Sequence, residues 1–239
     1  MSYSRGRPVT NINRGSFFVP RPSYDYLLAN LLPLGWWKLN DPVGSTTAVD
    51  SSGNGYTGTV NGGVTFGASG PLTTAATFDG STGYISLAAA PLEGVVNTGD
   101  FTFVSWCRPS STAPVNSGLI AFPAAVGLGT AMGLDFNGQG QVKADIYDDA
   151  VIGPMVLPNL AWSFVCCSLA RPLPTVNIYV NGEFDISGVF DVTPLVSLPP
   201  NIGEGIVTVY FPGDIAEVAI FGYALSPATI ALLYTAATS

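Results

Sequence analysis

The stretch TVNIYVNGEFDISG, residues 175–188, decides the fold class of this chain. From Val176 to Val180 its aliphatic side chains fall at every second position, so one face of a strand is apolar and the other is polar. The Asn181-Gly182 step that follows tolerates positive φ at both turn residues, which a two-residue hairpin requires. The stretch therefore predicts two antiparallel strands joined by a tight turn.

Strand signals of the same kind recur along the chain. FTFVSWCRP, residues 101–109, is apolar on both faces, as expected of a strand buried at the centre of a sheet. Asn137-Gly138 predicts a second hairpin between alternating segments. Only ALSPATIALLYTAATS has helical spacing, with Ser226 suited to the N-cap and Pro227 to the first turn. We expect this helix to be short and to pack at the edge of the β-sandwich that the predicted strands form.

The composition fits a single β-rich domain. Of the 239 residues, 47% are hydrophobic and 10% charged, while 28 Gly and 19 Pro favour short strands joined by turns. Cys107, Cys166 and Cys167 lie in apolar strand patterns, so we expect buried thiols and no disulfide framework. The chain has no histidine and no CxxC, which argues against zinc and excludes Ser-His-Asp and Cys-His catalysis within it.

The basic residues are concentrated at the N-terminus. Four of the eight precede residue 22 and no acid precedes Asp25, so this segment carries +4 against −12 for the rest. An acidic body argues against general nucleic-acid binding, and no apolar run is long enough to span a bilayer. The segment is either an attachment arm that orders against a partner or a solvated terminus. The candidate docking residues are Arg5, Arg7, Arg14, Phe17, Phe18 and Arg21.

Six segments together resemble the laminin-G-like, concanavalin A-like jelly-roll domains, in the order in which that family has them. They are GWWKLNDPVGSTTAVDSSGNGYTGTVNGGVTF, AATFDGSTGYISL, GDFTFVSWCRP, AWSFVCCSL, VNIYVNGE and GDIAEVAIFGYALSPATIALLY. The resemblance covers residues 34–236 and implies an all-β fold of two curved antiparallel sheets packed face to face. We accordingly divide the chain into an N-terminal docking arm, residues 1–33, and a laminin-G-like β-sandwich, residues 34–239.

The glycine-rich stretch VDSSGNGYTGTVNGG, residues 49–63, contains a candidate metal ligand, Asp50. Tight turns direct carbonyl oxygens inward, and Ca²⁺ takes six to eight oxygen ligands. The family resemblance implies that Asp41 and Asp214 are the acids of one calcium site near this stretch. The alternative is that Asp50 caps the turn by accepting backbone N–H bonds.

Sugar binding needs an exposed aromatic platform beside polar groups, and the sequence does not place such a site. The candidate aromatic residues are Trp36, Trp37, Tyr56, Tyr147 and Tyr210, each of which also suits a core or edge position, whereas Trp106 and Trp162 are expected in the core.

An enzyme reading rests on EFDIS, residues 183–187, which begins like the E-x-D-x-E strand of glucanases of this architecture. Ser187 stands where the third acid belongs, and Glu183 and Asp185 share one face, which is a poor arrangement for flanking a scissile bond. We therefore expect no catalytic residues and a non-enzymatic protein.

A docking arm joined to an adhesion-type fold, without a secretory signal, resembles an auxiliary virion protein of a tailed bacteriophage. Capsid decoration and a tail or fibre component both fit, with the arm on a major capsid or tail protein, several copies per particle, and assembly in the host cytoplasm. The sandwich would face outward, and its loops would contact host-surface glycans. The rivals are a carbohydrate-binding or adhesion module of a secreted bacterial protein and a glycoside hydrolase. Neither nucleic acid nor membrane is expected as a partner.

Overall fold

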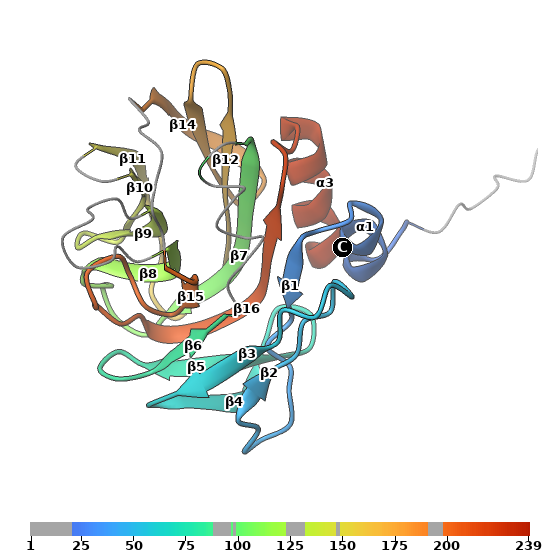
Figure 1. Cartoon of the computed structure of the whole chain (residues 1–239), viewed down its shortest axis with the longest axis vertical. Coiled ribbons are helices and arrows are strands. Elements are labelled where there is room, and N and C mark those ends of the chain that lie inside the picture. The colour runs from blue at the N-terminus through green and yellow to red at the C-terminus, as the bar shows by residue number, and fades with distance from the viewer. Residues whose placement is uncertain (1–20, 88–96, 98, 123–131, 147–148, 191–197) are drawn as a thin grey trace, which may run out of the picture.

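The chain folds into two stacked antiparallel sheets with a helix near each end (Figure 1). The computed structural model describes residues 21–87, 97, 99–122, 132–146, 149–190 and 198–239. The elements are α1 Tyr24–Asn30, β1 Gly35–Trp37, β2 Thr47–Ala48, β3 Gly58–Asn61, β4 Val64–Ser69, β5 Thr74–Asp79, β6 Tyr84–Ser86, β7 Phe101–Pro109, β8 Val115–Phe122, β9 Met132–Asn137, β10 Gln141–Ile146, β11 Asp149–Val156, β12 Ser163–Ala170, β13 Thr175–Val180, β14 Glu183–Val189, β15 Asn201–Ile202, β16 Pro212–Phe221 and α3 Pro227–Thr238.

The two sheets have eight strands each among the described residues. Sheet A has the order β14-β13-β12-β7-β16-β5-β4, and β1 pairs with β16; sheet B has the order β11-β10-β9-β8-β15-β6-β3-β2. Every pairing between these strands is antiparallel. The predicted antiparallel sandwich is therefore confirmed.

Both predicted hairpins are present. Asn181 and Gly182 join β13 to β14 with φ of 52° and 80°, the left-handed values that a two-residue hairpin turn requires. Gly138, with φ of 84°, lies in the turn between β9 and β10. Strand β7 is central in sheet A, between β12 and β16, and is buried along nearly its whole length, as its apolar pattern predicted.

The sandwich has two apolar layers because sheet A is covered on both faces. Between the sheets lie side chains such as Phe101, Phe103 and Trp37. On the outer face of sheet A, Trp106 and its neighbours pack beneath α1 and α3. The three cysteines are free and buried in these layers, as the sequence predicted.

Helix α3 begins as predicted, since the Ser226 Oγ accepts a hydrogen bond from the Thr229 N–H at 3.2 Å and Pro227 occupies the first turn. Its buried residues Ile230 and Leu233 pack on the outer face of sheet A. The expectation that this helix lies at the sandwich edge is wrong, because the outer face of sheet A is itself apolar and must be covered.

Helix α1 falls within residues 1–33, the predicted arm, yet it packs against the sandwich. Tyr24 and Leu28 are buried in the layer that α3 also covers, and Ser23 caps the helix through its Oγ. The packed part of the chain therefore begins near residue 23. No helix among the described ranges is long and apolar enough to cross a bilayer.

Candidate functional site

The glycine-rich turn is closed by the Asp50 carboxylate. Its Oδ1 accepts hydrogen bonds from the N–H groups of Trp36 (3.0 Å) and Ser52 (2.9 Å), and its Oδ2 accepts from the Ser52 Oγ (2.8 Å) and the Tyr56 N–H (2.9 Å). The Trp37 Nε1 then donates to the Tyr56 carbonyl at 2.7 Å. Asp50 therefore acts as the cap of this turn, and the turn closes over one end of the core.

The other two candidate calcium ligands have separate partners. Asp41 accepts a hydrogen bond from the Val49 N–H at 3.1 Å, and burial raises the pKa of its carboxyl group. The Asp214 Oδ2 lies 2.8 Å from the Arg108 Nε, and its Oδ1 accepts from the Thr77 hydroxyl. Within the described residues, no three His, Cys, Asp or Glu side chains form a group that holds a metal ion. A calcium site at Asp41, Asp50 and Asp214 stays a prediction.

Most of the candidate aromatic platforms are buried. Trp36 and Trp37 lie in the two apolar layers, as Trp106 does, and Tyr56 packs against the inner layer. The half-buried Trp162 lies beneath the Arg108 guanidinium, 5.1 Å from its ring centroid. Tyr147 lies outside the described residues, as do Arg5, Arg7, Arg14, Phe17 and Phe18 of the docking set. Tyr56 and Tyr210 are both partly exposed, and the Tyr210 ring lies beside Tyr84 of sheet B.

Polar side chains form a strip across the outer face of sheet B. The register pairs Thr59 with Ser86 and Ser86 with Asn201, so these three side chains form one cross-strand row on β3, β6 and β15. Their neighbours Ile85 and Ile202 point into the core, which directs the row outward. Asn61, the next residue of β3 on the same face as Thr59, donates its amide N–H to the Ser86 Oγ at 3.1 Å.

A hairpin-like excursion forms one side of this strip. Residues 203–211, between β15 and β16, form this excursion. Its two sides are joined by a bridge between Glu204 and Tyr210 and by a hydrogen bond from the Phe211 N–H to the Gly203 carbonyl at 2.9 Å. The Tyr210 ring lies 6.1 Å from the Tyr84 ring of β6, centroid to centroid, at 34°. The Asn201 amide donates to the Glu204 Oε2 at 2.7 Å.

We call these residues the sheet B strip: Thr59, Asn61, Tyr84, Ser86, Asn201, Glu204 and Tyr210. The strip offers two partly exposed aromatic rings next to amide and hydroxyl groups, and the buried Glu204 carboxyl group, 9% exposed, is held by the Asn201 amide. Burial raises the pKa of the Glu204 carboxyl group, and burial together with the Glu204 charge raises the pKa of Tyr210.

A rigid turn sets the position of Tyr84 in the strip. The Asp79 Oδ1 accepts hydrogen bonds from the N–H groups of Ser81, Thr82 and Gly83, each within 2.9 Å. These bonds favour the carboxylate and hold the pKa of Asp79 well below its usual range. These hydrogen bonds therefore fix the conformation of the turn that leads directly into β6.

A second acidic group lies further along the same face, under the excursion. Lys143 on β10 lies 3.4 Å from the Asp135 Oδ1 and contacts Asp145 and the Asn116 side chain more closely. Burial, with the Asp145 charge second, raises the pKa of Asp135. Asp135 and Asp145 are only 0% and 4% exposed, so neither carboxyl group reaches a substrate in solution. This cluster supports sheet B from beneath the excursion.

Glu183 and Asp185 lie on β14, the edge strand of sheet A. Asp185 contacts the neighbouring edge strand, because a Cβ on Gly153 of β11 would lie 1.9 Å from its Oδ2. The pair therefore sits where the two sheets meet, away from the sheet B strip.

Sequence reasoning missed most of the strip. Thr59-x-Asn61 and Tyr84-x-Ser86 are polar at alternate positions, which marks one solvent-facing side of a strand. This alternation identifies the solvent-facing side of each strand by itself. It does not show that β3, β6 and the distant β15 are neighbours.

The comparisons with known proteins agree with this architecture. The profile of the Concanavalin A-like lectin/glucanases superfamily matches residues 79–231, more than half of the chain. No curated protein matches the chain.

Several solved structures share the fold at low sequence identity. Domain 4 of AbnA, a GH43 extracellular arabinanase from Geobacillus stearothermophilus, in complex with arabinotriose, is 19% identical with a TM-score of 0.66 over 84% of this chain and 97% of that one. The botulinum neurotoxin serotype G binding domain is 17% identical with a TM-score of 0.66 over 85% and 50%. A structure of botulinum neurotoxin type C, whose cell entry depends on interaction with two ganglioside molecules, is 16% identical with a TM-score of 0.65 over 89% and 53%.

This chain thus spans about half the length of the toxin domains and nearly all of the arabinanase domain. With its laminin-G-type jelly roll and the profile match over residues 79–231, the chain belongs to the concanavalin A-like lectin/glucanase superfamily.

Proposed function

We propose that this protein is a non-enzymatic glycan-binding module whose sheet B strip is the sugar site. The observation that carries the proposal is the meeting of two partly exposed tyrosine rings with amide and hydroxyl groups on one outward face. A sugar ring stacks its C–H face on an aromatic ring, while its hydroxyls exchange hydrogen bonds with such polar groups. The fold neighbours that bind arabinotriose or depend on gangliosides support a sugar as the ligand class.

The carboxylates of the chain support a binding function over catalysis. A retaining glycosidase needs two carboxyl groups about 5 Å apart across the scissile bond. Asp135 and Asp145 are closed off from solvent, and Glu183 and Asp185 lie at a sheet edge. In the strip, Glu204 is a single carboxylate, held by the Asn201 amide.

We further propose that the N-terminal segment attaches this module to a larger particle, such as the virion of a tailed bacteriophage. Its support is the excess of arginine before residue 22 and the placement of its last residues, which lie on the surface beside α3. The partner would be a major capsid or tail protein, and the site of action the virion. A module from a secreted bacterial protein would share the glycan site and lack this attachment.

Glycan arrays and titration calorimetry test the sugar site. We expect saturable binding that falls about tenfold, or ~1.4 kcal/mol, in Tyr84→Ala and in Tyr210→Ala. Tyr26→Ala is the matched control, because Tyr26 is 62% exposed on α1, which lies on the other sheet. If all three variants bound the glycan with the affinity of the unsubstituted chain, the sheet B strip would not be the sugar site. Hydrolysis of a glycan panel that persists in purified protein would contradict the non-enzymatic assignment.

Particle binding tests the attachment separately. Deletion of residues 2–20 leaves every described element in place, so we expect unchanged glycan binding and loss of co-sedimentation with particles. A truncated chain that still co-sediments would refute the attachment and leave the glycan site standing.

A further inference from the structure

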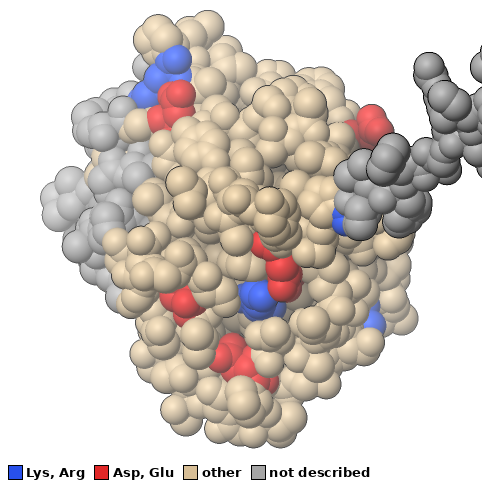
Figure 2. Space-filling model, turned by 90° about the vertical axis from the view of Figure 1, so that its right-hand side faces the viewer, with Lys and Arg blue, Asp and Glu red and all other residues tan. Residues whose placement is uncertain are grey.

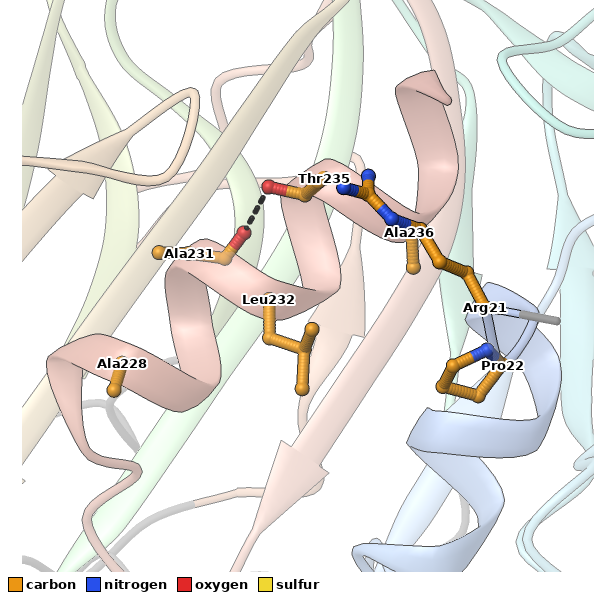
Figure 3. A pocket seen from close by; sticks show the side chains of 7 residues that line it. All are labelled: Arg21, Pro22, Ala228, Ala231, Leu232, Thr235 and Ala236. Carbon is orange, nitrogen blue, oxygen red and sulfur yellow. Dashed lines mark hydrogen bonds between the residues drawn. The ribbon is translucent and has the colours of Figure 1, made fainter. Parts of the chain in front are cut away.

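The outer side of α3 lines an open groove beside the start of the described chain. The groove has a volume of about 360 Å³ and lies between Arg21-Pro22 and the side of α3 that carries Ala228, Ala231 and Leu232 (Figure 3). A second hollow of about 200 Å³ lies between α1 and α3 and shares Leu232 with the first. The two hollows therefore form one surface, which we call the α3 groove.

The α3 groove is apolar and nearly uncharged. Leu232 at its centre is 48% exposed, and the residues of α3 around it are small. Arg21 is the one charged side chain among the residues that line the two hollows. The face that carries both helices shows only scattered acidic and basic side chains (Figure 2). An exposed leucine among alanines at such a hollow is suited to an aromatic side chain.

The sequence that continues from the groove supplies such side chains. Twenty residues precede Arg21, and they include the adjacent pair Phe17-Phe18. In VPRP, residues 19–22, a proline follows both Val19 and Arg21, which disfavours the helical region for each and favours an extended chain. At ~3.1 Å per residue, an extended chain carries Phe18 on the order of 12 Å away from Pro22. A spacer in this extended conformation would keep the phenylalanine pair away from its own Pro22, which favours the groove of a neighbouring molecule.

We propose that Phe17 and Phe18 of a second copy of this chain occupy the α3 groove, so that copies associate by exchanging their N-terminal segments. The exchange makes the groove a self-association site, with an aromatic dipeptide as the ligand. It goes beyond the proposed function, because it needs neither a glycan nor a particle. Residues 1–16, with Arg5, Arg7 and Arg14, stay available to a different partner.

Mixing two single-cysteine variants of the full chain tests the exchange directly. Phe18→Cys is made in one tagged copy and Leu232→Cys in an untagged copy, and the mixture is oxidised. We expect a disulfide-linked species that contains both copies, since the three native cysteines are buried. Leu173→Cys, 63% exposed and between β12 and β13, is the matched control for Leu232→Cys and should give no such species. A link that forms only within a chain carrying both substitutions, and never in the mixture, would overturn the proposal in favour of docking within one copy.

Light scattering and sedimentation measure the strength of association. We expect the full chain to associate in a concentration-dependent manner, and the dissociation constant to rise about tenfold or more in Leu232→Glu and in Phe17→Ala/Phe18→Ala. Leu173→Glu should match the unsubstituted chain. A full chain that stays monomeric over the whole concentration range, or an equal effect of Leu232→Glu and Leu173→Glu, would refute the proposal. Circular dichroism and thermal melting report independently that each variant is folded.

Discussion

One carboxylate, Asp50, accounts for the conformation of the glycine-rich turn. It receives four hydrogen bonds from three residues, one of which belongs to β1. Without these bonds the donors would be left unpaired in a part-buried site. We expect Asp50→Ala to lower the free energy of unfolding by about 2–4 kcal/mol, as measured by chemical denaturation.

The same variant separates a capping role from a calcium role. If Asp50 acts as a cap, chelator leaves the melting temperature of the unsubstituted chain unchanged, and the loss in Asp50→Ala is the same with and without chelator. Bound calcium would instead stabilise the folded chain by mass action, so chelator would lower its melting temperature and remove the difference between the two proteins.

Glu217 is a residue whose protonation affects the stability of the fold. It lies at a bulge in β16 with φ of 54°, and its carboxylate accepts a hydrogen bond from the Trp36 Nε1 at 2.8 Å. Burial raises its pKa to about 8, and the nearby Asp25 adds to the shift while Lys38 opposes it. At neutral pH the folded chain therefore holds a proton that the unfolded chain releases.

The sign of the pH dependence follows from this raised pKa. Well below pH 4.5 both states hold the proton, and between about 4.5 and 8 the folded state holds it while the unfolded state releases it, so stability falls with rising pH until it levels off above about 8. We expect the free energy of unfolding to fall between these values, by at most about 1.4 kcal/mol per pH unit. In Glu217→Gln, which keeps an acceptor for Trp36, this part of the slope should vanish. An identical slope in both proteins would contradict the assignment.

At the scale of elements, helix α1 has the least expected position. The sequence assigned residues 24–30 to a docking arm, whereas they cover the outer face of sheet A with Tyr24 and Leu28. We expect deletion of residues 2–20 to leave the melting temperature unchanged and deletion of residues 2–31 to lower it strongly. Leu28→Ala alone should cost about 2–4 kcal/mol in chemical denaturation, because it opens a cavity in a fully buried layer. Equal stability of both truncated chains would show that α1 does not stabilise the sandwich.

The elements that the sequence predicted are those encoded locally. The Asn181-Gly182 turn and the Ser226-Pro227 helix start need only neighbouring residues, and both are present. Helix α1 is different, because its burial depends on Trp106 and Phe164, which lie more than seventy residues further on. The sheet B strip is different for the same reason: Ser86 meets Asn201 only through the pairing of β6 with β15. A family resemblance predicted the sandwich, but it did not place the side chains of the strip.

At the scale of the whole molecule, the two sheets have different roles. Sheet A carries both helices on its outer face, with Arg21 and Pro22 beside α3, and this is the side on which we propose attachment and self-association. Sheet B presents polar side chains and two tyrosine rings on its outer face, so this side is suited to a ligand. Because the sandwich separates these faces, we expect glycan affinity to be the same in the full chain and in the chain lacking residues 2–20, as measured by calorimetry.

We propose above all that the outer face of sheet B binds sugar through Tyr84 and Tyr210. The most direct measurement is calorimetric titration of a glycan found on an array, with the unsubstituted chain, Tyr84→Ala, Tyr210→Ala and Tyr26→Ala in parallel. We expect about tenfold weaker binding in the two strip variants and unchanged binding in Tyr26→Ala. Unchanged affinity in both strip variants, with all four proteins folded, would contradict this proposal.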